Sequence, residues 1–469
     1  MVEAGFGQAD ITPSISTPLS GFIARENRPS TGIYSPLAVR ALALRNANLL
    51  YLLLSYDLLG LGVDLENQIQ ERLGTELGPG FARERCVLTA VHNHSGPPTG
   101  ILLGEKPSPP DYLERLVSQS VLAAKDALAA VRPSRLFMVE RHIPSLTYNR
   151  RALLTDGRVS IAPRPDLPIV SRGPLDDRMT ILLWRDLSGR NIAGLIHFAC
   201  HGVAVLSQEI GADIPGELAR KIGELIGAPC LFLQGAAGDV NPTTVTAGIS
   251  DLQSWVEQTL SYLRNLQDGF RFVQDEPIRA ITRSLYLNFA PLPSLEDAER
   301  NLDALLRIAA GDLNSIDLRD KILSFKNTMN LPSEVALDPA KALFTALTLA
   351  EHARLVLNLA QQGGPPPSQP LRVCVWRIGE FALAYLAGEI FASTGLKIRS
   401  LSRRLSILPV AYLSPLVGYL PDAEAIALGG YEITDAWRFY GKPAPLAANS
   451  ETRILEGLNM LIQELERIS

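Results

Sequence analysis

The sequence predicts an α/β fold with a mixed sheet core, flanking helices and one helical insertion. Short apolar runs alternate with amphipathic helical patterns through the first half of the chain. Long Leu/Ala-rich helical patterns fill residues 294–360, and strand-like runs return after them. With 469 residues, 46% of them hydrophobic and 20% charged, the chain can bury a large core.

The first half of the chain predicts four strands and three helices. The strands are apolar runs at 49–56, 86–91, 192–199 and 229–233, and the helical patterns cover 65–77, 112–131 and 215–226. The second helix opens with Asp111 and Glu114 in capping-box spacing and must end before Pro133, which cannot continue a helix. Strand, helix and strand in succession are typical of an α/β fold.

The second half predicts a helical insertion over 290–365 within a single catalytic domain that spans 1–469. The run 361–370, with three consecutive prolines, reads as a linker or stiff loop. Two strands at 371–378 and 381–385 are then expected to resume the sheet, and an amphipathic helix over 451–468 closes the chain.

The composition limits the class of binding partner and the cellular compartment that we expect. A net charge of -5 offers no basic footprint for phosphates, which favours a small molecule over nucleic acid. The longest apolar stretch, 49–63, is too short and too polar for a transmembrane segment. No leader pattern precedes Gly5, so we expect a cytoplasmic protein, or a secreted one if a leader was removed. Four dispersed cysteines predict buried free thiols. The oligomeric state is left open.

Four of the six histidines form two close pairs. His92 and His94 follow a predicted strand and precede a Ser-Gly-Pro-Pro turn, a placement that suits a metal, although two polar residues at a strand end are the alternative. His197 and His201 lie in an apolar run, where as strand residues they would share a face. A buried imidazole needs a partner or a metal. For His197 we expect a hydrogen bond to the backbone of the core.

Two further segments carry polar side chains beside predicted strands. Asp213 precedes a helix, where it caps that helix or orients a ligand histidine. The loop 234–242 is rich in small residues and allows a ligand to approach the backbone closely, with a structural turn as the alternative. This loop is neither a phosphate-binding loop nor a serine nucleophile elbow.

Together these segments resemble the catalytic N-terminal domain of the neutral/alkaline, non-lysosomal ceramidase family, in a shortened and divergent form. The matching motifs run in family order from Gly5 to Glu432. They are 5–12, 21–22, 39–41, 92–97, 149–151, 198–201, 211–213, 388–389, 418–419 and 430–432.

The resemblance implies a hydrolase that cleaves an amide (N-acyl) bond with one Zn2+, or another divalent ion. The metal ligands it implies are His92, His201, Glu389 and Tyr419, and it places His94 and Arg150 nearby for proton or substrate handling. Imidazole, carboxylate and phenolate are suitable donors for zinc.

One position departs from the family. Where the ceramidases carry a serine needed for activity, this chain has Asn241, which cannot act as a nucleophile but can donate to a developing oxyanion. We therefore expect metal-activated water as the nucleophile, Asn241 and Arg150 at the carbonyl oxygen, and His94 as the proton shuttle. We also expect no counterpart of the family's C-terminal β-sandwich, and therefore expect the substrate to be a small-molecule or lipid-like acyl compound other than ceramide.

Two alternatives remain from the sequence. One is a metal-dependent esterase or lactonase acting on a small polar substrate. The other is a catalytically silent relative that binds a ligand, which the serine replacement motivates and the retained metal ligands oppose. Turnover in a screen of acyl substrates distinguishes the two.

Overall fold

The fold is built on a nine-stranded mixed sheet. The computed structural model describes residues 2–161, 168–273, 277–328 and 336–467. The predicted mixed sheet is confirmed: parallel pairs lie at the two ends of the main sheet and antiparallel pairs lie between them. The strand order is β14 (Cys230–Gln234), β12 (Asn191–Phe198), β11 (Arg178–Asp186), β6 (Arg132–His142), β1 (Val2–Asp10), β3 (Ala38–Asn46), β4 (Leu49–Tyr56) and β5 (Cys86–Ala90), with β16 (Arg271–Phe272) on β6.

Both faces of this sheet are buried, and alternate residues of a strand enter different cores. In β3, Leu42 and Leu44 face one core while Ala41 and Ala43 face the other. Helices cover the second of these faces. Helices α1 (Val63–Leu77) and α2 (Pro110–Ala129) pack on β3, β4 and β5, while α3 (Asp213–Ile226) and α4 (Ile249–Tyr262) lie over β12 and β14.

The predicted capping box at the start of α2 is wrong. The helix begins at Pro110, and no side chain caps it, so Asp111 lies inside the first turn. The reason is that proline at the first helical position has its backbone dihedral already set and lacks the N–H that a cap would satisfy. The other predicted helices and strands of the first half are confirmed within a few residues of their expected bounds.

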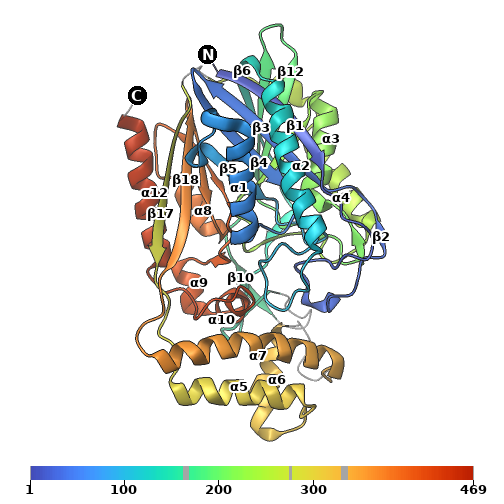
Figure 1. The fold of residues 1–469 in the computed structure, drawn as a ribbon, viewed down its shortest axis with the longest axis vertical. Coiled ribbons are helices and arrows are strands. Elements are labelled where there is room, and N and C mark those ends of the chain that lie inside the picture. The colour runs from blue at the N-terminus through green and yellow to red at the C-terminus, as the bar shows by residue number, and fades with distance from the viewer. Residues whose placement is uncertain (1, 162–167, 274–276, 329–335, 468–469) are drawn as a thin grey trace.

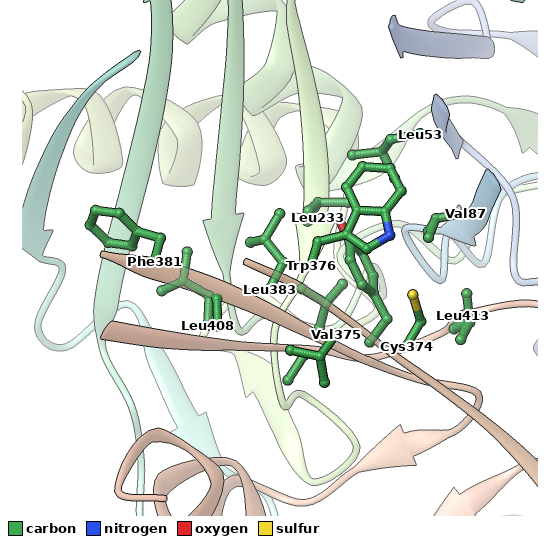
Figure 2. Packing of buried hydrophobic residues seen from close by; sticks show 14 of the residues in the cluster. Leu53, Val87, Leu233, Cys374, Val375, Trp376, Phe381, Leu383, Leu408 and Leu413 are labelled. Carbon is green, nitrogen blue, oxygen red and sulfur yellow. The ribbon is translucent and has the colours of Figure 1, made fainter. Parts of the chain in front are cut away.

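The strands that follow the prolines do not resume the main sheet. They join β17 (Arg279–Leu287), which precedes the helical segment, in a second, four-stranded sheet with the order β17, β18 (Gln369–Ile378), β19 (Phe381–Leu386) and β21 (Ser406–Val410). Figure 2 shows how this sheet packs on the first: Trp376 of β18 lies among Leu53, Val87 and Leu233 of the main sheet. Helices α8 (Ala392–Arg399) and α12 (Ser450–Arg467) pack on the second sheet. Periodicity identifies a strand but not its partner, which explains the error.

Most of the described residues between 295 and 362 are helical, as predicted. Helices α5 (Leu295–Ala309), α6 (Arg319–Thr328) and α7 (Pro339–Gln362) lie at one end of the molecule, away from the main sheet (Figure 1). Leu305, Ile308, Ala346 and Leu349 form a small core of their own. No helix among the described residues is long and apolar enough to cross a membrane. All four cysteines are buried free thiols, as expected.

Short elements build the loops beside the strand ends. The short strands are β2 (Gly32–Ile33), β7 (Thr147–Asn149), β8 (Ala152–Leu154), β9 (Val159–Ser160), β10 (Ile169–Arg172), β13 (Glu209–Ile210), β15 (Val240–Pro242), β20 (Glu389–Ile390) and β22 (Tyr419–Leu420). The short helices are α9 (Ala423–Leu428), α10 (Tyr431–Thr434) and α11 (Ala436–Phe439). Several of these segments carry polar side chains to one site.

Candidate metal centre

The two histidine-bearing loops meet where β5 and β12 end. Gln234, at the end of β14, joins them: its Nε2 donates to Val91 O (3.0 Å) and Cys200 O (2.6 Å), and its Oε1 accepts from Cys200 N (3.0 Å). The backbone N–H of His94 also donates to Gly202 O at 3.1 Å. Because Gln234 is fully buried, these bonds hold the loops together without competition from water.

His92, His94 and His201 form a buried group that could hold a metal ion, with one ring nitrogen of each within 4.8 Å of the others. Nδ1 of His92 lies 2.9 Å from Leu59 O, and Nδ1 of His201 lies 2.9 Å from Ala237 O. Carbonyl oxygens only accept, so each Nδ1 carries the proton and each Nε2 keeps a free lone pair. Metal-ligating histidines are typically oriented in this way.

Glu389 faces these lone pairs from β20. Its Oε2 lies 3.2 Å from His92 Nε2 and 3.9 Å from His201 Nε2, and the residue is completely buried. Around an ion with bonds of about 2.0–2.1 Å, tetrahedral donors lie roughly 3.3–3.4 Å apart. The 3.2 Å separation is close to this spacing and the 3.9 Å separation is about half an ångström longer, so the carboxylate lies near both imidazole nitrogens.

Two tyrosines hold the Glu389 carboxylate. Tyr412 OH donates to Oε2 at 3.3 Å, and Tyr440 OH donates to Oε1. Burial keeps the pKa of both hydroxyls well above the usual range, so both stay protonated donors. Tyr412 also stacks on His92 with ring centroids 4.3 Å apart. The backbones of His92 (φ 59°) and Tyr412 (φ 60°) are left-handed, a strain that cores tolerate mainly at functional sites.

His94 completes the histidine group from the side of Gly21. Its ring lies 4.8 Å from the His92 ring and 5.3 Å from the His201 ring. Its buried Nε2 has no hydrogen-bond partner among the described residues. Burial and then the neighbouring His92 hold the pKa of His94 and His201 well below the usual imidazole range. Both rings are therefore neutral at neutral pH, as metal binding or proton acceptance requires.

Arg150 links the remaining candidate residues. Its Nη2 donates to Tyr419 OH at 2.8 Å, its Nη1 to Asn241 Oδ1 at 3.4 Å, and its Nε to Glu432 at 3.0 Å. Burial alone would lower the pKa of Arg150, but Tyr419 and Glu432 raise it well above its usual value. The guanidinium thus places a fixed positive charge between Asn241 and Tyr419. Tyr419 pairs with Glu389 through the backbone of β22, while its hydroxyl bonds with Arg150.

The loop 235–241 positions several of these groups at once. Ala237 O holds His201, and Asp239 accepts from Asn149 Nδ2 (2.6 Å) and Ala392 N (2.7 Å). Gly238 N donates to Ile390 O at 2.8 Å, and a Cβ at Gly238 would lie 2.7 Å from Glu389 O. Burial raises the pKa of Asp239 to about 6. These contacts confirm the structural-turn interpretation of the loop, and close approach of a ligand to its backbone stays a prediction.

Two further histidine and aspartate predictions have clear outcomes. His197 is a buried core residue whose Nε2 lies 2.7 Å from Pro409 O, as predicted. The expectation that His197 and His201 share a strand face is wrong, because β12 ends at Phe198 and His201 lies in the loop beyond. Asp213 begins α3 and accepts from Ile214 N, Ala204 N and Val205 N, so it bonds its own helix and also the loop after His201.

The sequence interpretation missed three residues that contact the predicted site. Tyr412 and Tyr440 hold Glu389, and both oxygens of Glu432 are paired, one with Arg150 and one with Arg151. A signal was present: four of the 12 tyrosines fall between residues 412 and 440. Nothing in the sequence says which of these hydroxyls meet the carboxylate.

No protein-family model matches the sequence. The fold is similar to that of solved structures. One is the neutral ceramidase from Pseudomonas aeruginosa, with a TM-score of 0.68 and 16% identity, covering 98% of this chain and 73% of that one. Another is a ceramidase complexed with C2, with a TM-score of 0.70 and 16% identity, covering 99% of this chain and 75% of that one. The chain therefore has a ceramidase-like fold.

Proposed function

We propose that this protein is a metal-dependent hydrolase that cleaves an amide (N-acyl) bond. The observation that carries the proposal is the convergence of His92 Nε2, His201 Nε2 and Glu389 Oε2 at spacings suited to one divalent ion, zinc in the first place. The ceramidase-like fold supports the reaction class, with ceramide itself not the expected substrate. In this proposal residues 1–469 are one catalytic domain, and 290–365 are an insertion within it.

Tyr419 completes the proposed donor set of His92, His201 and Glu389. Bound there, the ion supplies Lewis-acid polarisation of a carbonyl oxygen and a lowered pKa for water. The carbonyl contacts of the two histidine Nδ1 atoms and the two tyrosine contacts to Glu389 would keep these donors in place. His94 is assigned outside the set, although its ring nitrogen is close enough for a three-histidine arrangement.

The chain's own residues account for the proton and charge movements of amide hydrolysis. The oxygen of water bonds to the acyl carbon, the C–N bond breaks, and the amine leaves with a proton. Neutral His94 accepts the proton from water and returns it to the leaving nitrogen. Arg150 and the Asn241 amide stabilise the negative charge on the carbonyl oxygen, because Asn241 Oδ1 accepts from Arg150 and leaves the amide Nδ2 to donate.

Elemental analysis of the purified protein tests the metal centre. We expect near-stoichiometric zinc in the wild type and in His142→Ala, a control at an exposed histidine, and loss of zinc in His92→Ala. A screen of N-acyl substrates, from short to long, should show turnover in the first two proteins only. Hydrolysis retained in His201→Ala would overturn the assignment, and stoichiometric metal without any turnover would favour a ligand-binding relative.

Asn241→Ala tests the proposed oxyanion role. Removing one such donor typically lowers kcat by about 100- to 1,000-fold. We expect a loss of this order with unchanged zinc content, because Asn241 is not a proposed ligand. Wild-type turnover in Asn241→Ala would show that the amide does not stabilise the carbonyl oxygen.

A further inference from the structure

A pocket shares two of its lining residues with the surroundings of the candidate metal centre. Tyr419 and Tyr440 line it, and these same residues contact Arg150 and Glu389 through their hydroxyl groups. Phe289, Ile433 and Leu446 contribute apolar walls. A substrate whose scissile bond lies at the metal centre can therefore place its next group in this pocket.

The pocket contains an unpaired cation. Lys442 lines it, and its ammonium group makes no hydrogen bond or ion pair with any residue that the structure describes. Glu432, the pocket's acidic residue, is occupied by Arg150 and Arg151. Burial lowers the pKa of Lys442 to about 8, so the ammonium group is still mostly protonated at neutral pH.

A second donor lines the same pocket without a partner. Trp437 Nε1 is buried and makes no hydrogen bond with the described residues, although an indole N–H can only donate. Leaving a buried donor unsatisfied costs about 1–3 kcal/mol. A buried indole N–H without a partner and an ammonium group without a counter-ion thus line the same pocket, which suits a ligand group that accepts hydrogen bonds and carries negative charge.

One histidine of the helical segment contacts both the Lys442 backbone and the Trp437 ring. His352 Nε2, on α7, lies 2.7 Å from Lys442 O, and its ring meets the Trp437 ring edge-on with centroids 5.0 Å apart. Lys442 N also donates to Trp437 O at 3.0 Å. The backbone at Lys442 is thus fixed, unlike that of a mobile surface lysine, which reduces the entropy lost on binding.

We propose that the substrate is an N-acylated amino acid whose carboxylate binds Lys442 and Trp437 in this pocket. The inference rests on the proposed amide hydrolysis and names its substrate class. A carboxylate accepts from both donors and neutralises the ammonium charge, whereas a neutral head group would leave that charge unpaired. The apolar walls contact the remainder of the amino-acid moiety.

The test compares two substrates with the same scissile bond, N-octanoylglycine and its neutral analogue N-octanoylglycinamide, by release of octanoate. For the wild type we expect a higher kcat/KM with the carboxylate. Lys442→Met should lower kcat/KM for N-octanoylglycine roughly 10- to 100-fold, mainly through KM, because a charge-assisted hydrogen bond is lost. The kcat/KM of Lys442→Met for N-octanoylglycinamide should equal that of the wild type. Lys442→Arg should keep part of the preference for the carboxylate substrate, and all of these proteins should contain the same amount of zinc. Lys106→Met is the control at an exposed lysine.

Calorimetric titration of the zinc-free protein separates this inference from the proposed function. N-octanoylglycine should bind more tightly than the glycinamide, and Lys442→Met should abolish the difference. Equal kcat/KM for both substrates in the wild type, or equal losses for both in Lys442→Met, would overturn the carboxylate assignment while hydrolysis stands. Lys442-dependent binding without any turnover would retain the carboxylate site and overturn the hydrolase.

Discussion

Replacing Gly238 with alanine tests whether the loop 235–241 sets the position of Glu389. The added Cβ would lie 2.7 Å from Glu389 O and 3.0 Å from Ile390 O. Carbon–oxygen contacts normally lie at about 3.3–3.6 Å, so one of the two backbones must move by roughly half an ångström. The movement also strains the bond from Gly238 N to Ile390 O, now 2.8 Å.

The expected magnitude follows from these contacts. Overpacking of this kind destabilises a core by about 1–3 kcal/mol. Loss of a group that orients metal ligands typically lowers metal affinity about 10- to 100-fold. We expect both effects in Gly238→Ala, because the same loop also holds His201 through Ala237 O.

Urea unfolding of the zinc-free protein measures the first effect, and zinc competition with a chromophoric chelator measures the second. Gly80→Ala is the matched control, since a Cβ at Gly80 meets no atom within 4 Å. Equal results for Gly238→Ala and Gly80→Ala in both assays would show that residue 238 is not packed closely against the backbone of Glu389 and Ile390. A loss of stability with unchanged zinc affinity would show that the loop does not position Glu389.

Two more predictions concern a ligand contact and a buried histidine. Tyr440→Phe removes a hydrogen-bond donor to Glu389, so zinc affinity should fall about 10- to 100-fold in competition assays. Tyr286→Phe, at an exposed tyrosine, should bind zinc as the wild type does. Equal zinc affinities for Tyr440→Phe and the wild type would refute the contact. Burial lowers the pKa of His197 from 6.5 to about 4, so its contribution to folding stability is complete above the unfolded pKa and is lost as pH falls from about 6.5 to 4. Unfolding of zinc-free His197→Gln should therefore depend less steeply on pH than that of the wild type, by at most about 1.4 kcal/mol per pH unit, and identical slopes would contradict this.

The strands that the sequence did not predict show where pattern alone fails. β1 contains Gly5 and Gly7, which ordinarily weaken a strand. In the structure a Cβ at either position would lie 2.1 Å from a carbonyl oxygen of α2, so these glycines allow the helix to pack directly on the strand. Such a requirement depends on a neighbour more than a hundred residues away in the chain and leaves no local periodicity.

The sequence by itself determined the α/β class and the helices between 295 and 362, and it singled out the histidine pairs. Local periodicity and residue chemistry suffice for these, because burial of one face and the need of a buried imidazole for a partner act within a few residues. Glu389 and Tyr419 were suggested only by the resemblance to the ceramidases. Tertiary structure alone decided that the later strands form a second sheet and that Tyr412 and Tyr440 meet Glu389. These outcomes depend on packing between segments that are far apart in the chain. The distance between a tyrosine hydroxyl and the Glu389 carboxylate is set by the loops that carry the two residues, and their separation in the sequence does not predict it.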